Sequence, residues 1–175
     1  MFYSGIKAAS SENGVGLRTS FFVSGCRHHC PGCFNSATWS FNNGQEYTEK
    51  VEEKVLKSLE PRYVSGLTVL GGEPLEIENQ PVVLELIRKV KERFPEKTVW
   101  IYTGFTWEEL FEGSRATSQY ILPILEMVEV LIDGRFEIKK KDLSLKFRGS
   151  SNQRVIDVQK SLAEGKVVIS HYLND

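Results

Sequence analysis

Three cysteines stand within eight residues, and the chain has no others: Cys26, Cys30 and Cys33. Their C-x3-C-x2-C spacing allows one loop to wrap three thiolates around a cluster of four irons and four sulfides. Ferredoxin-type sites use four cysteines for such a cluster, so three would leave one iron without a protein ligand. Because an open metal position is typical of catalytic sites, the loop predicts a catalytic [4Fe–4S] cluster with one open iron site.

A zinc site is an alternative use of the same loop. Zinc accepts three cysteines and one histidine, so the three cysteines with His28 or His29 would complete a ligand set. Structural zinc sites usually take ligands from two separated pairs, whereas these candidates share one loop. A ferredoxin-like electron carrier is a second alternative, but it needs a fourth cysteine. Either histidine could also donate a hydrogen bond to a cluster sulfur and raise the reduction potential of the cluster. For both histidines, we favour the interpretation that they are solvated loop residues.

Composition limits the classes of function. The chain has 175 residues, of which 41% are apolar and 26% charged, and these ordinary values predict a single domain over residues 1–175. A net charge of −1 argues against non-specific nucleic-acid binding, which needs a basic surface. No stretch approaches the roughly 20 apolar residues of a membrane span, and residues 1–7 lack a signal-peptide core. We therefore expect a cytoplasmic protein without nucleic-acid or membrane partners.

Apolar patterns predict strands that alternate with helices, as in a mostly parallel α/β sheet. The predicted strands cover residues 18–24, 66–70, 98–103 and 128–132, with further candidates at 154–158 and 166–170. The predicted helices cover residues 48–59, 80–94 and 120–127, and Thr106 with Glu109 forms a capping-box pattern for a short one. Because the chain is short for a complete eight-strand barrel, we expect an incomplete, laterally open barrel with mostly parallel strands.

Four motifs directly follow predicted strands: the cysteine loop, Gly71-Gly72-Glu73, Thr103 and Asp133. Since sites in parallel α/β folds form at the carboxyl ends of strands, we expect these loops to converge on one rim. Gly71 and Gly72 let the backbone approach a ligand closely. Glu73 offers a carboxylate to an ammonium group, such as that of S-adenosylmethionine (SAM). The alternative for this motif is a plain strand-to-helix turn.

Three further residues are candidates for contacts with SAM. Asn35 can bond SAM or the cluster loop, and its alternative is a turn-forming asparagine. Thr103 can present a hydroxyl to the ribose or methionine part, and its alternative is ordinary packing. Asp133 can meet the sugar hydroxyls or hold a catalytic arginine, and its alternative is a helix cap or a turn. The lysine run 139–141 is interpreted as a solvated loop.

Together these motifs resemble the radical SAM superfamily over almost the whole chain. More narrowly, the chain resembles the family of proteins that activate anaerobic ribonucleoside-triphosphate reductase. This narrower resemblance rests on residues 12–18, 22–26, 30–33, Asn35, Trp39, 71–74, 102–104, 131–136 and 148–153. The stretches DGRF and RGSSNQ within it favour this family over the activases of pyruvate formate-lyase.

The resemblance also implies where SAM binds. It puts the backbone from Gly32 to Phe34, including Cys33, near the SAM adenine. Many radical SAM enzymes carry an aromatic or large apolar residue just before the third cysteine, where this chain has Gly32. The aromatic contact expected there is therefore missing unless Phe34, which follows the cysteine, supplies it.

A reaction follows from the resemblance. The reduced cluster would cleave SAM to methionine and a 5′-deoxyadenosyl radical, which would remove a hydrogen from a glycine loop of the reductase and leave a glycyl radical. Flavodoxin or a similar electron donor is implied. A small domain cannot enclose a large protein substrate, so the open side of the barrel should admit the glycine loop. The alternatives are an activase of the pyruvate formate-lyase type, a radical SAM enzyme for small molecules, and a metal-stabilised binding module.

Overall fold

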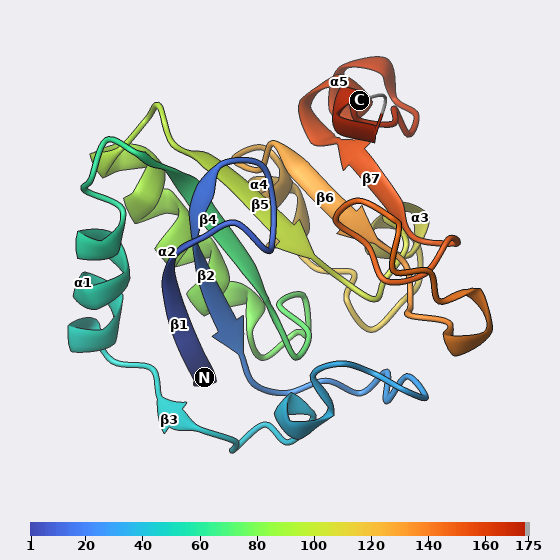
Figure 1. Cartoon of the computed structure of the whole chain (residues 1–175), viewed down its shortest axis with the longest axis horizontal. Coiled ribbons are helices and arrows are strands. Elements are labelled where there is room, and N and C mark those ends of the chain that lie inside the picture. Colours follow the sequence, from blue (N-terminus) through green and yellow to red (C-terminus); the bar gives the residue numbers. More distant parts are fainter. Residues whose placement is uncertain (174–175) are drawn as a thin grey trace.

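Seven strands form one sheet in the computed structural model, which describes residues 1–173 (Figure 1). In spatial order they are β3 (Gln45–Glu46), β1 (Phe2–Ser10), β2 (Leu17–Val23), β4 (Val64–Gly71), β5 (Thr98–Tyr102), β6 (Val130–Asp133) and β7 (Arg154–Asp157). The middle strands β2, β4, β5 and β6 run parallel, whereas β1, β3 and β7 pair antiparallel with their neighbours. The sheet is therefore mixed, and it ends at β3 and β7 without closing.

The expected predominance of parallel strands holds only in the centre of the sheet. Residues 11–16 join β1 to β2 and are too few for a crossover, so these two strands pair antiparallel. Residues 134–153 join β6 to β7, and their one helical element is the short 3-10 helix η2 (Ile138–Lys140). Because this connection contains no crossover helix, β7 pairs antiparallel with β6. The outer strands are consequently antiparallel.

Two further expectations about the elements need correction. The candidate strand at 166–170 was wrong, because that segment forms only one isolated bridge, between Ile169 and Ile156. Strand β1 was not predicted, since register shifts interrupt its pairing with β2 and Ala9 has a positive φ of 49°. The remaining predicted strands are confirmed to within two residues at each end.

Within residues 1–173, five α-helices accompany the sheet: α1 (Glu49–Ser58), α2 (Gln80–Arg93), α3 (Trp107–Phe111), α4 (Ile121–Leu125) and α5 (Val158–Glu164), the last of which was not predicted. The Thr48 side chain caps α1 by accepting from the Val51 N–H. The predicted capping box of Thr106 and Glu109 begins α3. No helix in the described part of the chain is long and apolar enough to cross a membrane.

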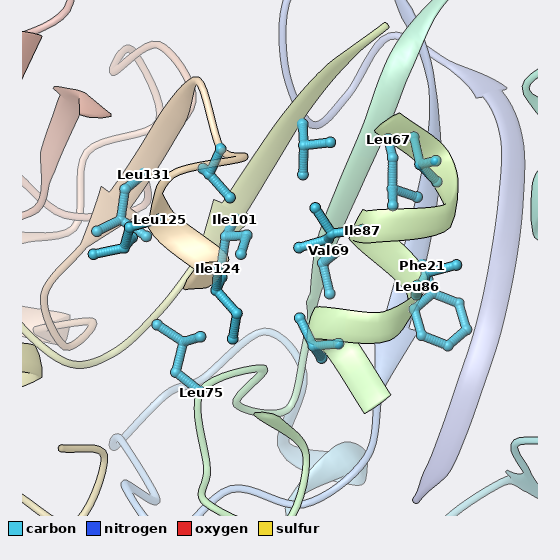
Figure 2. Packing of buried hydrophobic residues seen from close by; sticks show 14 of the residues in the cluster. Phe21, Leu67, Val69, Leu75, Leu86, Ile87, Ile101, Ile124, Leu125 and Leu131 are labelled. Atoms are coloured by element: carbon cyan, nitrogen blue, oxygen red, sulfur yellow. The ribbon is translucent and has the colours of Figure 1, made fainter. Parts of the chain in front are cut away.

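The main core lies between one face of the sheet and the helices α2 and α4 (Figure 2). Phe21, Val69 and Ile101 point from three parallel strands toward this core, and all three are fully buried. Successive side chains of a strand point to opposite faces. Their neighbours Phe22, Leu70 and Tyr102 consequently face the other side, where they line cavities beside the cysteine loop. The fold thus separates a helix-covered core face from a face that is available for chemistry.

Candidate functional site

The cysteine loop leaves the carboxyl end of β2 and is held at its base by backbone hydrogen bonds. The Gly25 N–H donates to the Thr38 carbonyl over 2.8 Å, and the Cys26 N–H donates to the Trp39 carbonyl over 3.0 Å. A turn connects Cys30 to Cys33, in which the Cys33 N–H donates to the Cys30 carbonyl over 3.0 Å. All three thiols are free, and all three line one cavity of about 130 Å³. The loop therefore brings its three sulfurs to one space.

The three thiols are partly withdrawn from water. Burial is the main cause that raises the pKa of the Cys26 thiol to about 12, and nearby Glu73 adds to the rise. Burial also raises the pKa of Cys30. The Asn35 N–H donates to the Cys33 sulfur over 3.4 Å. A bound cation would displace the thiol protons, and N–H donors of this kind stabilise the thiolates that remain. This donor set fits an iron–sulfur cluster.

The glycine loop after β4 packs directly against the cysteine loop. The Gly72 N–H donates to the Val23 carbonyl, and the Glu73 N–H donates to the Gly25 carbonyl, both over 2.8 Å. A Cβ atom on Gly72 would stand 2.6 Å from the Gly25 carbonyl oxygen, which is backbone and cannot rotate away. Glycine at this position is therefore required by the close approach of two backbones.

The Glu73 carboxylate is 1% exposed and accepts from four donors of the protein. One oxygen accepts from the Thr103 hydroxyl at 2.8 Å and the Leu75 N–H at 2.9 Å. The other accepts from the Gly104 N–H at 2.7 Å and bonds His28 Nε2 at 3.1 Å. Glu73 thus ties together three loops around the cavity, and the expected contact with the SAM ammonium stays a prediction.

His28 is part of this arrangement, so its interpretation as a solvated residue was wrong. Its side chain is 2% exposed, and Arg115 Nη2 lies 3.1 Å from its Nδ1. Because a guanidinium only donates, Nδ1 accepts, and Nε2 carries the hydrogen that is donated to Glu73. His29 is exposed, as expected, and stacks on Trp39 at 4.4 Å. The spacing within the CRHHC segment gave no signal that distinguished the two histidines.

The zinc alternative has no geometric support in the described residues. There, no three His, Cys, Asp or Glu side chains converge closely enough to hold one metal ion. Both candidate histidines are engaged elsewhere, His28 with Glu73 and His29 with Trp39. The cysteines of a four-iron cluster each bind a different iron, so they have no need to converge on one atom.

Glu76 is a site residue that sequence reasoning missed. Its side chain is fully buried, accepts from the Arg27 N–H at 2.8 Å and forms ion pairs with the side chains of Arg27 and Arg115. Arg115 also contacts His28, so the ion pairs reach the cysteine loop from two sides. The sequence carried no signal for Glu76, since Arg115 stands 39 residues away.

Thr103 follows β5 and Asp133 ends the neighbouring strand β6, but the two residues have different roles in this structure. Thr103 lines the cavity of the three cysteines and bonds Glu73. The Asp133 carboxylate, 1% exposed, accepts from the Trp107 N–H at 2.7 Å and from Arg154 Nε at 3.0 Å. It is not among the residues that line either cavity beside the cysteines, although the next residue, Gly134, is.

A second cavity of about 560 Å³ adjoins the first and shares lining residues with it, Cys33, Asn35 and Tyr102 among them. Phe34 lines this larger cavity, is 62% exposed and lies 5.2 Å from the Phe136 ring. The two cavities form a continuous recess on the sheet face opposite the helices. A ligand at the cysteines can therefore extend along it.

Gly32 lies beside the recess without lining it. Its φ of +74° is in the left-handed region, and a Cβ atom there would stand 2.5 Å from the Ile138 side chain. Glycine is therefore needed both for the turn of the cysteine loop and for the close packing of η2. Sequence reasoning also did not select other lining residues, which come from several loops and include Glu12, Asn13, Phe136, Arg148 and Gln153.

Residues 12–156 match the family model of a 4Fe-4S single cluster domain. A protein of Vibrio cholerae named anaerobic ribonucleoside-triphosphate reductase-activating protein is 40% identical over 143 residues, which are 81% of this chain and 88% of the relative. Its counterpart in Escherichia coli K12 is 38% identical over 82% of this chain and 90% of its own length. That of bacteriophage T4 is 39% identical over 89% of this chain and 93% of its own.

The chain belongs to this family of reductase-activating proteins. Membership confirms the narrower resemblance of the sequence. The match to a single-cluster domain agrees with three free cysteines on one cavity and supports a [4Fe–4S] cluster as the metal cofactor of the activating protein. It covers β2, β4, β5 and β6 together, the strands whose carboxyl ends carry the site loops.

Proposed function

We propose that this protein activates anaerobic ribonucleoside-triphosphate reductase by generating a glycyl radical on it. When SAM is bound beside it, the reduced [4Fe–4S] cluster would supply the one electron that the reductive cleavage of SAM requires. One observation carries the proposal: three free cysteines share a cavity with the glycine loop after β4 and the threonine after β5. The names of the relatives identify the reductase as the protein acted on.

Each cysteine is proposed to bind one iron of the cluster and to leave the fourth iron open for SAM. Gly71, Gly72 and Glu73 line the same cavity and would bind the methionine part, with Thr103 beside them. Backbone groups of the two glycines are the best candidates for direct contact, because the Glu73 carboxylate already has four donors. Glu73 would then act by positioning the loop.

The larger cavity is proposed to receive the adenosine part of SAM. Phe34 and Asn35 line it, and Phe34 would provide the aromatic contact that Gly32 cannot. Gly32 would contribute the turn that brings the loop backbone close. For Asp133 we propose an indirect part, in which its bonds to Trp107 and Arg154 hold Gly134 at the cavity.

We infer that the open sheet is an incomplete barrel of the radical SAM type, and that residues 1–175 act as one domain. The four adjacent parallel strands with site loops at their carboxyl ends support this inference. Such a barrel has an uncovered side. The rim of the larger cavity reaches solvent at Phe34, so a loop of the reductase could approach the cysteines from there.

The chemistry needs electrons of low potential. We propose flavodoxin or a similar protein as the donor, and the reducing cytoplasm as the location, which suits three unpaired cysteines on one loop. The protein's own residues bind and orient the reactants and exclude water. Glu73, Thr103 and Cys26, which line the cavity, are buried.

Anaerobic reconstitution tests the function. Protein loaded with iron and sulfide is given dithionite and SAM, and 5′-deoxyadenosine is measured. Its cognate anaerobic reductase is then added, and the glycyl radical is measured by electron paramagnetic resonance. We expect both products from the native chain and neither from Cys26→Ala, Cys30→Ala or Cys33→Ala, which should also retain less iron.

Asn42→Ala is the matched control, because Asn42 is an exposed residue of the same loop region. It should keep native iron content and both products. Cleavage of SAM without any glycyl radical on the reductase would reject activation of this partner. A cysteine variant with full turnover would remove that residue from the ligand set.

A further inference from the structure

Residues 137–148, here called the rim segment, form one wall of the larger cavity. Asp142, Leu143, Leu145, Phe147 and Arg148 all line it. Phe34, next to Cys33, lines the same cavity. The rim segment therefore borders a cavity that also has Cys33 in its lining.

Two large apolar side chains are exposed at the mouth of the cavity. Leu143 is 84% exposed, the highest value among the large hydrophobic side chains that the structure describes, and Phe34 is 62% exposed. An exposed leucine forgoes the stabilisation that burial of its apolar surface would contribute. Exposed apolar side chains at the edge of a recess are typical of a surface that a partner covers.

The rim segment is also positively charged. Five of its side chains are cationic and two are anionic, which leaves a net charge of +3 in a chain whose total is −1. The Lys141 Nζ lies 5.2 Å from the centre of the Phe34 ring, at the mouth. Lys139, Lys141 and Lys146 form no ion pair within residues 1–173, whereas Lys140 pairs with Glu137. The lysines are therefore available to carboxylates of a partner.

The rim segment is anchored to the cysteine loop and to the stretch before β7. Ile138 packs on Gly32, and Phe136, the residue just before the segment, packs on Phe34. The Asp142 N–H donates to the Gly149 carbonyl, and the Ser151 N–H donates to the Lys140 carbonyl. This segment is consequently a preformed surface rather than a loop that must close over the site.

We propose that the rim segment is the docking surface for the glycine-bearing segment of the reductase, with Leu143 and Phe34 contacting an apolar side chain and the lysines pairing with carboxylates beside it. The inference rests on the proposed function. The occupant is a peptide segment because the charged and apolar rim surrounds a cavity that leads to Cys33. A protein that only delivers electrons needs closeness to the cluster but no such recess.

The test compares matched variants of the reconstituted protein. Leu143→Glu and Lys141→Glu are set against Leu122→Glu, an exposed leucine of α4, and Lys50→Glu, an exposed lysine of α1. The reductase concentration that gives half-maximal glycyl radical formation is measured for each. Cleavage of SAM without reductase is measured in parallel, because it reports on the cluster and SAM alone.

We expect each rim variant to raise the half-maximal reductase concentration about tenfold or more, while both control variants match the native protein. Cleavage of SAM without reductase should change less than about twofold in Lys141→Glu, because Lys141 lines neither cavity. Added salt should weaken reductase binding to the native protein more than to Lys141→Glu. Salt screens the attraction between the Lys141 ammonium and carboxylates of the reductase, and the variant lacks this ammonium.

Two results would overturn the docking surface while the proposed function stands. One is that both rim variants reach half-maximal glycyl radical formation at the same reductase concentration as the native protein. The other is that a rim variant requires a higher concentration of an acidic electron-donor protein, but needs only the native concentration of reductase when dithionite supplies the electrons. If the native protein cleaves no SAM at all, the proposed function fails, and this inference falls with it.

Discussion

The Glu73 carboxylate lies among four donors that come from three loops, and this arrangement changes what its charge does. From the sequence, Glu73 was a candidate partner for the SAM ammonium. In the fold, the carboxylate joins Thr103, Gly104 and His28 into one wall of the cavity. A buried anion with a complete set of donors stabilises the arrangement of those donors.

Glu73→Gln should therefore destabilise the protein. A glutamine amide replaces one acceptor oxygen by an NH₂ donor, which must face donors such as the Gly104 N–H or His28. Leaving one buried donor without an acceptor costs about 1–3 kcal/mol, and we expect that loss in the free energy of unfolding, measured by anaerobic urea denaturation. Glu78→Gln is the control, because the Glu78 side chain is 46% exposed and its loss should cost under about 1 kcal/mol. Equal effects would contradict this interpretation of Glu73.

At the scale of elements, the site depends on how closely two strand-end loops approach. The loops after β2 and β4 are joined by backbone hydrogen bonds of 2.8 Å, and Gly72 stands at the closest point. Parallel pairing brings the carboxyl ends of β2 and β4 to the same edge of the sheet. The position of the cysteines relative to the glycine loop is therefore set by backbone packing.

Gly72→Ala should separate these loops and reduce cluster loading. The added Cβ would meet the Gly25 carbonyl at 2.6 Å, so one loop must shift. Overpacking of this kind costs typically about 1–3 kcal/mol. The measurement is iron per chain after anaerobic reconstitution, with circular dichroism to verify folding. Gly5→Ala is the matched control, since a Cβ on Gly5 meets nothing within 4 Å. Native iron content in a folded Gly72→Ala protein would refute the argument.

For the molecule as a whole, a buried cation links three parallel strands on the face that carries the site. Arg18 of β2 is 1% exposed, and burial lowers its pKa to about 10. Its guanidinium donates to the Thr68 hydroxyl of β4, to the Thr98 hydroxyl of β5 and to carbonyls of both strands. Its carbon lies 5.1 Å from the centre of the Trp100 ring. Because Thr68 donates to the Asn13 carbonyl, Arg18 also supports one wall of the larger cavity.

Arg18→Met should destabilise the whole fold by at least about 3 kcal/mol, because carbonyls on two strands lose their donor in a buried place. Arg18→Lys should recover only part of this loss, since one ammonium cannot reach acceptors on both strands in the fork geometry of a guanidinium. Midpoints of urea denaturation measure both changes. Arg62→Met, at an exposed position, serves as the control. A native midpoint in Arg18→Met would show that the buried charge contributes nothing.

Local patterns predicted most of the strands and the positions of the site loops, because each depends on residues close in sequence. The helical period of 80–94, the capping box at Thr106 and the apolar run at 66–70 are examples. Strand β1 escaped prediction because its pairing is irregular. Glu76, His28 and Arg115 escaped because their contacts join residues that are 39 to 87 apart, and no local pattern records such pairs.

The sequence by itself determined which metal cofactor this protein is expected to bind. That prediction uses only the type and spacing of Cys26, Cys30 and Cys33 on one loop, and it does not depend on distant residues. The sequence also determined which loops follow strands. Only the tertiary structure decided the partners of the charged and polar side chains at the site. The Glu73 carboxylate accepts hydrogen bonds from donors of the protein, Asp133 accepts from the first residue of α3, and the His28 side chain is buried. The reason is physical, because burial and hydrogen-bond partners come from segments that meet only when the sheet assembles.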